Sequence, residues 1–239
     1  MNYVYGPVKS RRLGMSVGLS ITPFKYCTLD CVYCQLKSTS KPTLKRKEYI
    51  NHQAIISEVS QFFKEYPDYK KIDYVTFSGS GEPLLNSKIK EIIQAVKGIT
   101  KIPVALITNS TMLCDPQVRS EILDLDLILP SLDAFTQDIF DKIDRPSKPN
   151  IRVEDILNGL TDLRQEFKGK IWLEIMLIKG INDDIGYLTQ FQKVVALVRP
   201  DKIQLNVPSR PPSESWVKIP ALERLNKAQE IFGKNCELV

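Results

Sequence analysis

The chain has 239 residues, of which 43% are hydrophobic and 26% are charged, as in ordinary globular domains. This length allows one large domain or two small ones with a substantial core. No apolar run approaches the roughly 18 residues that a membrane span needs, so we expect no membrane association. The net charge of +5 is mild, and it permits an acidic partner such as RNA without requiring one.

Six segments have the apolar, β-branched character of buried strands. They are residues 17–22, 72–77, 102–107, 125–129, 170–178 and 202–207. Segments with apolar residues at helical spacing alternate with them. These are residues 51–66, 88–96, 116–123, 135–143, 153–167, 185–198 and 221–232. Such alternation predicts a parallel sheet with right-handed crossovers.

This pattern predicts the α/β class. Six strand–helix units are too few for a full eight-stranded barrel, so we expect a partial (β/α)6 TIM-like barrel with parallel strands, open on one side. We assign residues 1–220 to this barrel and residues 221–239 to a C-terminal helix and tail packed on the same domain. No linker or short repeat interrupts the pattern.

Three cysteines, Cys27, Cys31 and Cys34, fall within one short segment. Thiolates at this spacing can hold three irons of a [4Fe–4S] cluster and leave the fourth iron open. A zinc site is the alternative, but the other candidate ligands (Cys114, Cys236 and the single histidine, His52) are isolated in the sequence. We expect Cys114 and Cys236 to be bystanders.

The same cysteines bear on the compartment. The first 12 residues lack the apolar stretch of a signal peptide. Five cysteines in 239 residues do not resemble a secreted disulfide scaffold, and free thiols need a reducing environment. We therefore expect a cytoplasmic protein.

Polar and glycine residues follow each predicted strand. They include residues 78–83 after the second strand, Asn109 after the third, Ser131 and Asp133 after the fourth, and residues 208–212 after the sixth. In parallel α/β folds, ligands bind at the carboxyl ends of the strands. The sequence therefore predicts a single site around the three cysteines.

These motifs resemble a known family. The segment Cys27-x3-Cys31-x2-Cys34, with Tyr33 before the last cysteine, resembles the signature of radical S-adenosylmethionine (radical SAM) enzymes. The segment Gly79-Ser80-Gly81-Glu82-Pro83 is similar to their glycine-rich element, with Ser80 in place of its first glycine. Further motifs resemble the wyosine-synthetase-like Fe–S oxidoreductases: residues 6–14, 23–25, 34–35, 131–134 and 210–212. The wyosine enzymes carry additional N-terminal cysteines, which this sequence lacks.

The resemblance implies an enzyme that uses a [4Fe–4S] cluster and S-adenosylmethionine. The cluster would reductively cleave S-adenosylmethionine to a 5′-deoxyadenosyl radical, which would take hydrogen from a substrate. Cys27, Cys31 and Cys34 would ligate iron. The expected cofactor contacts are Tyr33, Gly79, Ser80, Gly81, Glu82, Asn109, Ser131, Asp133, Glu174 and Asn206.

Several of these residues also fit a structural role. Glu82 suits the N-terminus of a helix, where the dipole favours negative charge. Tyr33 could pack under the cysteine loop. Asn109, Ser131 and Asp133 could each serve as turn residues, and Glu174 could point away from the barrel interior.

The substrate stays open at this level. Arg11, Arg12 and Arg210 are the candidate substrate-binding residues, because guanidinium groups bind phosphate and carboxylate. RNA, a protein and a small metabolite are all compatible, and we expect an electron donor such as flavodoxin or ferredoxin. A non-enzymatic Fe–S carrier or a zinc-stabilised binding protein is the alternative from another class.

Overall fold

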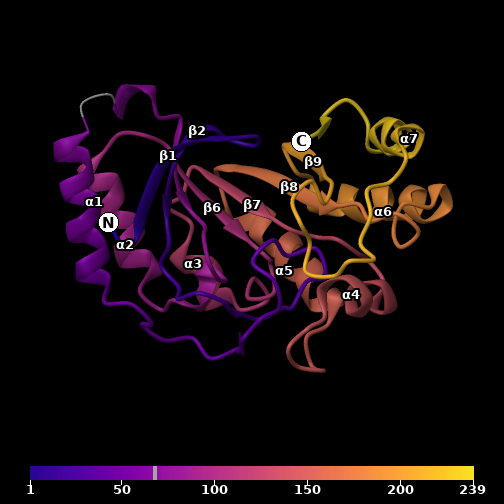
Figure 1. The fold of residues 1–239 in the computed structure, drawn as a ribbon, viewed down its shortest axis with the longest axis horizontal. Helices are drawn as coiled ribbons and strands as arrows, with labels where there is room; N and C mark the ends of the chain where they lie inside the picture. The colour runs from indigo at the N-terminus through magenta and orange to yellow at the C-terminus, as the bar shows by residue number, and fades with distance from the viewer. Residues whose placement is uncertain (67–68) are drawn as a thin grey trace.

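A twisted sheet lies at the centre of the computed structural model, which describes residues 1–66 and 69–239 (Figure 1). Within these residues the sheet has eight strands in the order β1-β2-β5-β6-β7-β8-β9-β10. All neighbours are parallel except β1 and β2, and the end strands β1 and β10 do not pair. The strands are β1 Val4–Ser10, β2 Gly14–Leu19, β5 Tyr74–Phe77, β6 Val104–Thr108, β7 Leu127–Pro130, β8 Lys170–Met176, β9 Lys202–Asn206 and β10 Cys236–Leu238. The prediction of a partial barrel, open on one side, is confirmed.

The helices cover the outer, convex face of the sheet (Figure 1). They are α1 His52–Glu65, α2 Ile89–Ile99, α3 Pro116–Glu121, α4 Gln137–Asp144, α5 Val153–Glu166, α6 Ile185–Val198 and α7 Leu222–Phe232. Two single turns of 3-10 helix, η1 Tyr69–Lys71 and η2 Pro83–Leu85, complete them. Within the described residues, none of these helices is long and apolar enough to cross a membrane.

Every predicted strand and helix is present, with ends shifted by a few residues. Two sheet strands were missed: β1, which forms an antiparallel hairpin with β2, and β10, which extends the sheet beyond β9. The C-terminal segment joins the main core, since Leu225, Ala228 and Phe232 of α7 belong to the largest apolar cluster.

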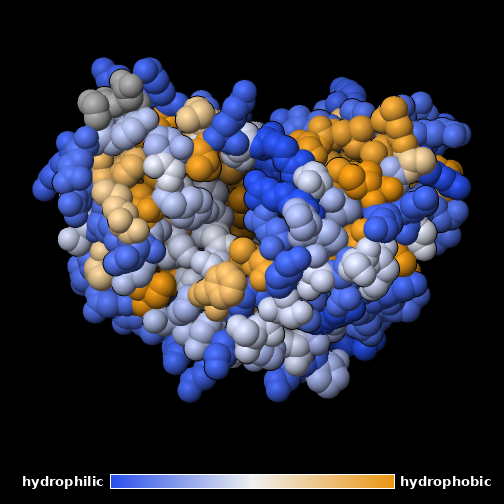
Figure 2. All heavy atoms as spheres, viewed as in Figure 1, coloured by the Kyte–Doolittle hydropathy of each residue, from blue (hydrophilic) through white to orange (hydrophobic). Residues whose placement is uncertain are grey.

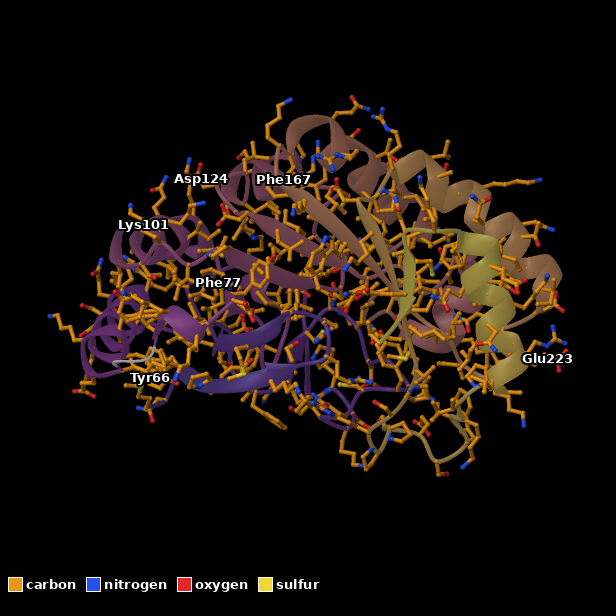
Figure 3. The ribbon with its side chains drawn as sticks, turned by 90° about the horizontal axis from the view of Figure 1, so that it is seen from above. Tyr66, Phe77, Lys101, Asp124, Phe167 and Glu223 are labelled. Atoms are coloured by element: carbon orange, nitrogen blue, oxygen red, sulfur yellow. The ribbon has the colours of Figure 1, made fainter. Side chains whose placement is uncertain are left out.

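Strand alternation divides the residues between two environments. Outward residues such as Val75 and Phe77 join the main core beneath the helices, and Figure 3 shows Phe77 inside the molecule, away from the peripheral Lys101 and Asp124. Inward residues instead line the concave face. At the lower end of the barrel, which is formed by the amino ends of the parallel strands, Leu13 from the β1–β2 turn packs with Ala105, Leu127 and Leu129. This end of the barrel is therefore filled with apolar side chains.

Three aspartates hold the lower edge of the sheet in register. Each aspartate directly precedes a strand and forms two hydrogen bonds with one residue of the neighbouring strand. The backbone N–H of the aspartate donates to the carbonyl of that residue, and the carboxylate accepts the N–H of the same residue at 2.7 or 2.8 Å. These paired bonds leave neither backbone group unsatisfied. The pairs are Asp73 with Met15, Asp126 with Val104, and Asp201 with Ile171.

We predict that Asp126→Ala lowers the free energy of unfolding by about 1–2 kcal/mol, because the partly buried Val104 N–H loses its partner. The matched control is Asp124→Ala, two residues away at an exposed position, with an expected loss below about 0.5 kcal/mol. Urea unfolding with an unchanged m value measures both. Equal losses in the two variants would contradict this role.

Candidate functional site

The cysteine loop is held from both sides by backbone hydrogen bonds. Cys27 ends the short strand β3 (Tyr26–Cys27), which pairs with β4 (Lys41–Pro42). On the other side the loop runs along the end of α4, where the N–H groups of Asp30 and Val32 donate to the carbonyls of Asp144 (3.0 Å) and Ile143 (2.9 Å). The three half-buried cysteines thus come from a loop that the rest of the fold positions.

Among the residues that the structure describes, each cysteine sulfur makes one polar contact with a side chain outside the cysteine set. Asn109 Nδ2 lies 3.4 Å from Cys27 Sγ, Lys25 Nζ lies 3.4 Å from Cys34 Sγ, and the Cys31 thiol donates to Asp144 Oδ1 at 3.2 Å. Burial raises the pKa of the Cys27 thiol to about 11. Burial, followed by the charge of Asp144, raises the pKa of Cys31 well above its usual value. Iron must therefore displace protons when it binds these thiols.

The glycine-rich segment after β5 is docked directly against the start of the cysteine loop. The Lys25 N–H donates to the Ser80 carbonyl at 2.6 Å, and the Glu82 N–H donates to the Tyr26 carbonyl at 2.9 Å. A Cβ on Gly81 would stand 2.3 Å from that same Tyr26 carbonyl oxygen. Gly81 is thus required by the approach of the chain's own backbone. Gly79, with φ of 129° against Ser20, is likewise in a conformation that favours glycine.

Glu82 is buried, and its carboxylate is already occupied by protein partners. It accepts from Thr108 Oγ1 at 2.7 Å, from the Asn109 N–H at 2.9 Å and from the Leu84 N–H at 3.1 Å. The last contact caps η2, which is the structural role that the sequence also allowed. Glu82 therefore joins the ends of β5 and β6 beside the cysteine loop.

A second buried group lies on the opposite side of the cysteines. The Tyr33 hydroxyl donates to Asp133 Oδ2 at 2.5 Å, and Asp133 Oδ1 accepts the Met176 N–H at 2.7 Å. Burial raises the pKa of Asp133 to about 6 and that of Asp144 well above its usual range. The pocket between them has a volume of about 10 Å³, enough for about one water molecule. Among its lining residues are Tyr33, Asn109, Ser131, Asp133 and Asp144.

Glu174 and Asn206 lie farther along the concave face and contact each other. Asn206 Nδ2 donates to Glu174 Oε1 at 3.1 Å, and Arg12 Nη1 lies 2.6 Å from both carboxylate oxygens. Arg12 thus reaches from the β1–β2 turn across the open side of the barrel to β8. Its neighbour Arg11 donates to the Val239 carbonyl at 3.1 Å, just beyond β10.

The predicted site residues therefore form two groups. Figure 2 shows hydrophilic side chains where the β1–β2 hairpin approaches the end of the sheet. The cysteines, Tyr33, residues 79–82, Asn109, Ser131 and Asp133 lie at the carboxyl ends of the strands. Glu174, Asn206 and Arg12 form an ion-pair network deeper in the barrel. Arg210 is exposed and donates to the Gln35 side chain, next to Cys34.

The donor set suits an iron–sulfur cluster. Across residues 1–66 and 69–239, no group of three or more His, Cys, Asp or Glu side chains surrounds a single-ion site. A cubane cluster does not require one, because each cysteine ligates a different iron. The three thiols lie close together, since the charge of Cys27 contributes to the raised pKa of Cys31 and that of Cys34 to the raised pKa of Cys27. Two of the sulfurs also have an N–H donor beside them. Soft ligands in such an arrangement fit an iron–sulfur cluster.

A family model described as the Radical SAM superfamily matches residues 21–189, more than half of the chain. The chain belongs to the radical SAM superfamily. A UPF0026 protein of Methanocaldococcus jannaschii is 35% identical over 98% of this chain and 74% of its own length. A protein named GTPase Obg of Brachyspira hyodysenteriae is 40% identical over 98% of this chain, which spans only 34% of that protein.

Further similarities are more distant. A probable dual-specificity RNA methyltransferase, RlmN of Thermotoga maritima, is 30% identical over 87% of this chain and 59% of its own length. Among solved structures, a radical SAM methyltransferase from Sphaerobacter thermophilus has a TM-score of 0.66 at 15% identity, covering 94% of this chain and 65% of that chain. Streptococcus suis SuiB bound to S-adenosylmethionine also has a TM-score of 0.66 at 15% identity, covering 93% and 49%.

Membership in the radical SAM superfamily implies S-adenosylmethionine and a [4Fe–4S] cluster as cofactors. The three cysteines and their surroundings fit that implication.

Two site residues were missed at the sequence level. Lys25 lies in the motif Pro23-Phe24-Lys25, but no sequence pattern indicates that its side chain contacts a cysteine. Asp144 ends α4, 113 residues from Cys31, and no local pattern marks it.

We predict that Cys31→Ser abolishes cluster assembly, because serine removes one of three thiolate ligands. Iron and sulfide content after anaerobic reconstitution measures this. Cys114→Ser is the matched control and retains the iron content of the unmodified protein, since Cys114 is exposed and its thiol is hydrogen-bonded only to the Thr111 carbonyl among the described residues. Undiminished iron in Cys31→Ser would refute the ligand assignment.

Proposed function

We propose that this protein is a radical SAM enzyme that binds a [4Fe–4S] cluster through Cys27, Cys31 and Cys34 and cleaves S-adenosylmethionine reductively. The observation that carries the proposal is the docking of the cysteine loop against residues 79–82 at the carboxyl ends of the strands. When bound, the cofactors would supply a 5′-deoxyadenosyl radical that takes hydrogen from the substrate.

The chain's own residues hold and enclose this site. Asn109 and Lys25 place N–H donors beside two of the cysteine sulfurs. Glu82 fixes Asn109 through its backbone N–H. Tyr33, Asn109, Ser131 and Asp133 line a small polar pocket that also includes Asp144, the partner of the Cys31 thiol. The polar groups of these residues suit the cofactor's amino, carboxylate and ribose groups.

The expected outcome of reconstitution and reduction with dithionite under anaerobic conditions is formation of 5′-deoxyadenosine from added S-adenosylmethionine. The Cys31→Ser protein forms none. An electron paramagnetic resonance spectrum that S-adenosylmethionine perturbs would accompany the cleavage. A reduced, iron-loaded protein that binds S-adenosylmethionine and yields no cleavage product would refute the proposal and favour an iron–sulfur carrier.

For the substrate we propose RNA. The relative named as an RNA methyltransferase supports this class. So does the lysine-rich segment of residues 37–47, which follows the cysteine loop. In this segment Lys41 and Lys45 are exposed and have no side-chain partner among the described residues. RNA binding is driven largely by phosphate contacts with such groups. The same lysines suit an acidic electron donor such as flavodoxin or ferredoxin, which we propose as the source of the electron.

Arg12 is the residue that we propose for a phosphate inside the barrel. Its side chain is 30% exposed, whereas its partner Glu174 is 5% exposed. Only Nη1 makes a hydrogen bond among the described residues, which leaves Nε and Nη2 available. Glu174 thereby fixes the plane of a guanidinium group whose remaining donors can bind an anion in a forked arrangement.

We predict that Arg12→Gln weakens the binding of unfractionated tRNA and reduces the slope of log K against log salt by about 1, the value for one lost phosphate contact. Arg224→Gln, an equal charge change at an exposed position of α7, leaves the slope unchanged. Arg12→Lys keeps the positive charge and is expected to retain the slope, because the slope depends on the charge at this position. Identical slopes for Arg12→Gln and Arg224→Gln would contradict the phosphate contact.

A protein substrate is the second candidate, and the open side of the barrel is the observation that favours it, because an extended loop could enter between β1 and β10. In that case tRNA binding would be insensitive to Arg12, and a radical would be trapped on the partner protein.

A further inference from the structure

Lys25 is buried, although its side chain carries an ammonium group. The residue is 3% exposed, and its Nζ lies 3.4 Å from Cys34 Sγ. Among the described residues, no Asp or Glu carboxylate lies within 4.0 Å of this nitrogen. Other cations with largely buried side chains do have carboxylate partners: Arg119 pairs with Glu166, and Arg46 pairs with Glu121.

The backbone of Lys25 is also in a conformation that a lysine rarely adopts. Its φ is 60°, in the left-handed region where glycine, asparagine and aspartate are favoured. Its N–H donates to the Ser80 carbonyl at 2.6 Å, and its carbonyl accepts the Lys41 N–H at 3.2 Å, so the conformation is fixed by both neighbours. A glycine would satisfy these backbone bonds without strain. The side chain, rather than the turn, therefore explains why lysine occupies this position.

Burying an ammonium group without an anionic partner is costly, because the group loses its hydration. The partner that the geometry offers is the set of cysteine sulfurs. Three thiolates carry more negative charge than an oxidised cubane core offsets, and reduction adds a further electron. A fixed cation beside Cys34 would interact more favourably with the reduced cluster than with the oxidised one. Hydrogen bonds to sulfur and local charge are among the factors that set cluster potentials.

We propose that Lys25 is a positioning residue that raises the reduction potential of the cluster, by holding its ammonium group against the sulfur of Cys34. The proposal rests on the cysteines holding a cluster, as in the proposed function, but on neither S-adenosylmethionine cleavage nor the identity of the substrate.

The test is an anaerobic redox titration of the reconstituted protein, followed by electron paramagnetic resonance without S-adenosylmethionine. Lys25→Met is expected to lower the midpoint potential by at least 59 mV, which is a tenfold change in the one-electron equilibrium. Lys25→Arg keeps the charge and is expected to change that equilibrium less than threefold. Lys41→Met, an exposed change on the adjoining strand that retains its backbone N–H, is the matched control and leaves the potential unchanged.

Stability of the iron-free protein separates this role from a structural one. Lys25→Met removes a buried charge and is expected to leave the unfolding midpoint equal or higher. A residue needed only for folding would instead lower it. Should Lys25→Met hold no iron, Lys25→Gln takes its place with the same threshold.

A one-electron equilibrium constant in the neutral variants within threefold of that of the unmodified protein, at equal iron content, would overturn the proposal. An equal shift in Lys41→Met would do so too, because the effect would then be one of general surface charge. Failure of the unmodified protein to bind iron would be a failure of the proposed function and is visible before any potential is measured.

Discussion

The contact between residues 79–82 and the start of the cysteine loop is the constraint on which the site depends. Two backbone hydrogen bonds, from Lys25 to Ser80 and from Glu82 to Tyr26, join segments that are more than 50 residues apart in the sequence. Gly81 permits this approach, since any side chain there would overlap the Tyr26 carbonyl. Glu82 then connects the pair to β6 through Thr108 and Asn109. The cysteines, the glycine-rich segment and the loop that begins at Asn109 after β6 are therefore positioned as one unit.

This arrangement explains why polar groups are concentrated where the sheet ends. The strands of the core are apolar, whereas Glu82, Asp133 and Asp144 are buried carboxyl groups at or near the carboxyl ends of the strands. Burying carboxyl groups disfavours their charged form, and burial is the main cause of the raised pKa of all three. Backbone N–H groups offset part of that cost for Glu82 and Asp133. Perturbed groups of this kind gather at functional sites.

Much of the fold could be predicted from the sequence, because the central parallel strands are short apolar runs and the helices have clear apolar stripes. The strand β1 was missed because it is an edge strand whose Tyr5 and Val8 are exposed and which contains Pro7. The three-residue strand β10 is too short to leave a pattern.

The identity of the site residues was easier to predict than their contacts. The cysteine spacing defines a ligand set locally. In contrast, two of the partners of Glu82, Thr108 and Asn109, are 26 and 27 residues away, and the partner of Arg12 is 162 residues away. Such contacts depend on tertiary packing, and so the reach of Arg12 to Glu174 and of Lys25 to Cys34 became visible only in the structure.

The open side of the barrel has a mechanical consequence. In a closed barrel the girth is determined by the number and stagger of the strands. Here the first and last strands are not hydrogen-bonded to each other, and two arginine side chains, Arg11 and Arg12, span from the hairpin to Val239 and Glu174. The contacts across the opening are therefore made by the side chains of Arg11 and Arg12, and no strand-to-strand backbone hydrogen bonds join β1 to β10. The width of the opening is thus set by side-chain contacts rather than by backbone hydrogen bonds.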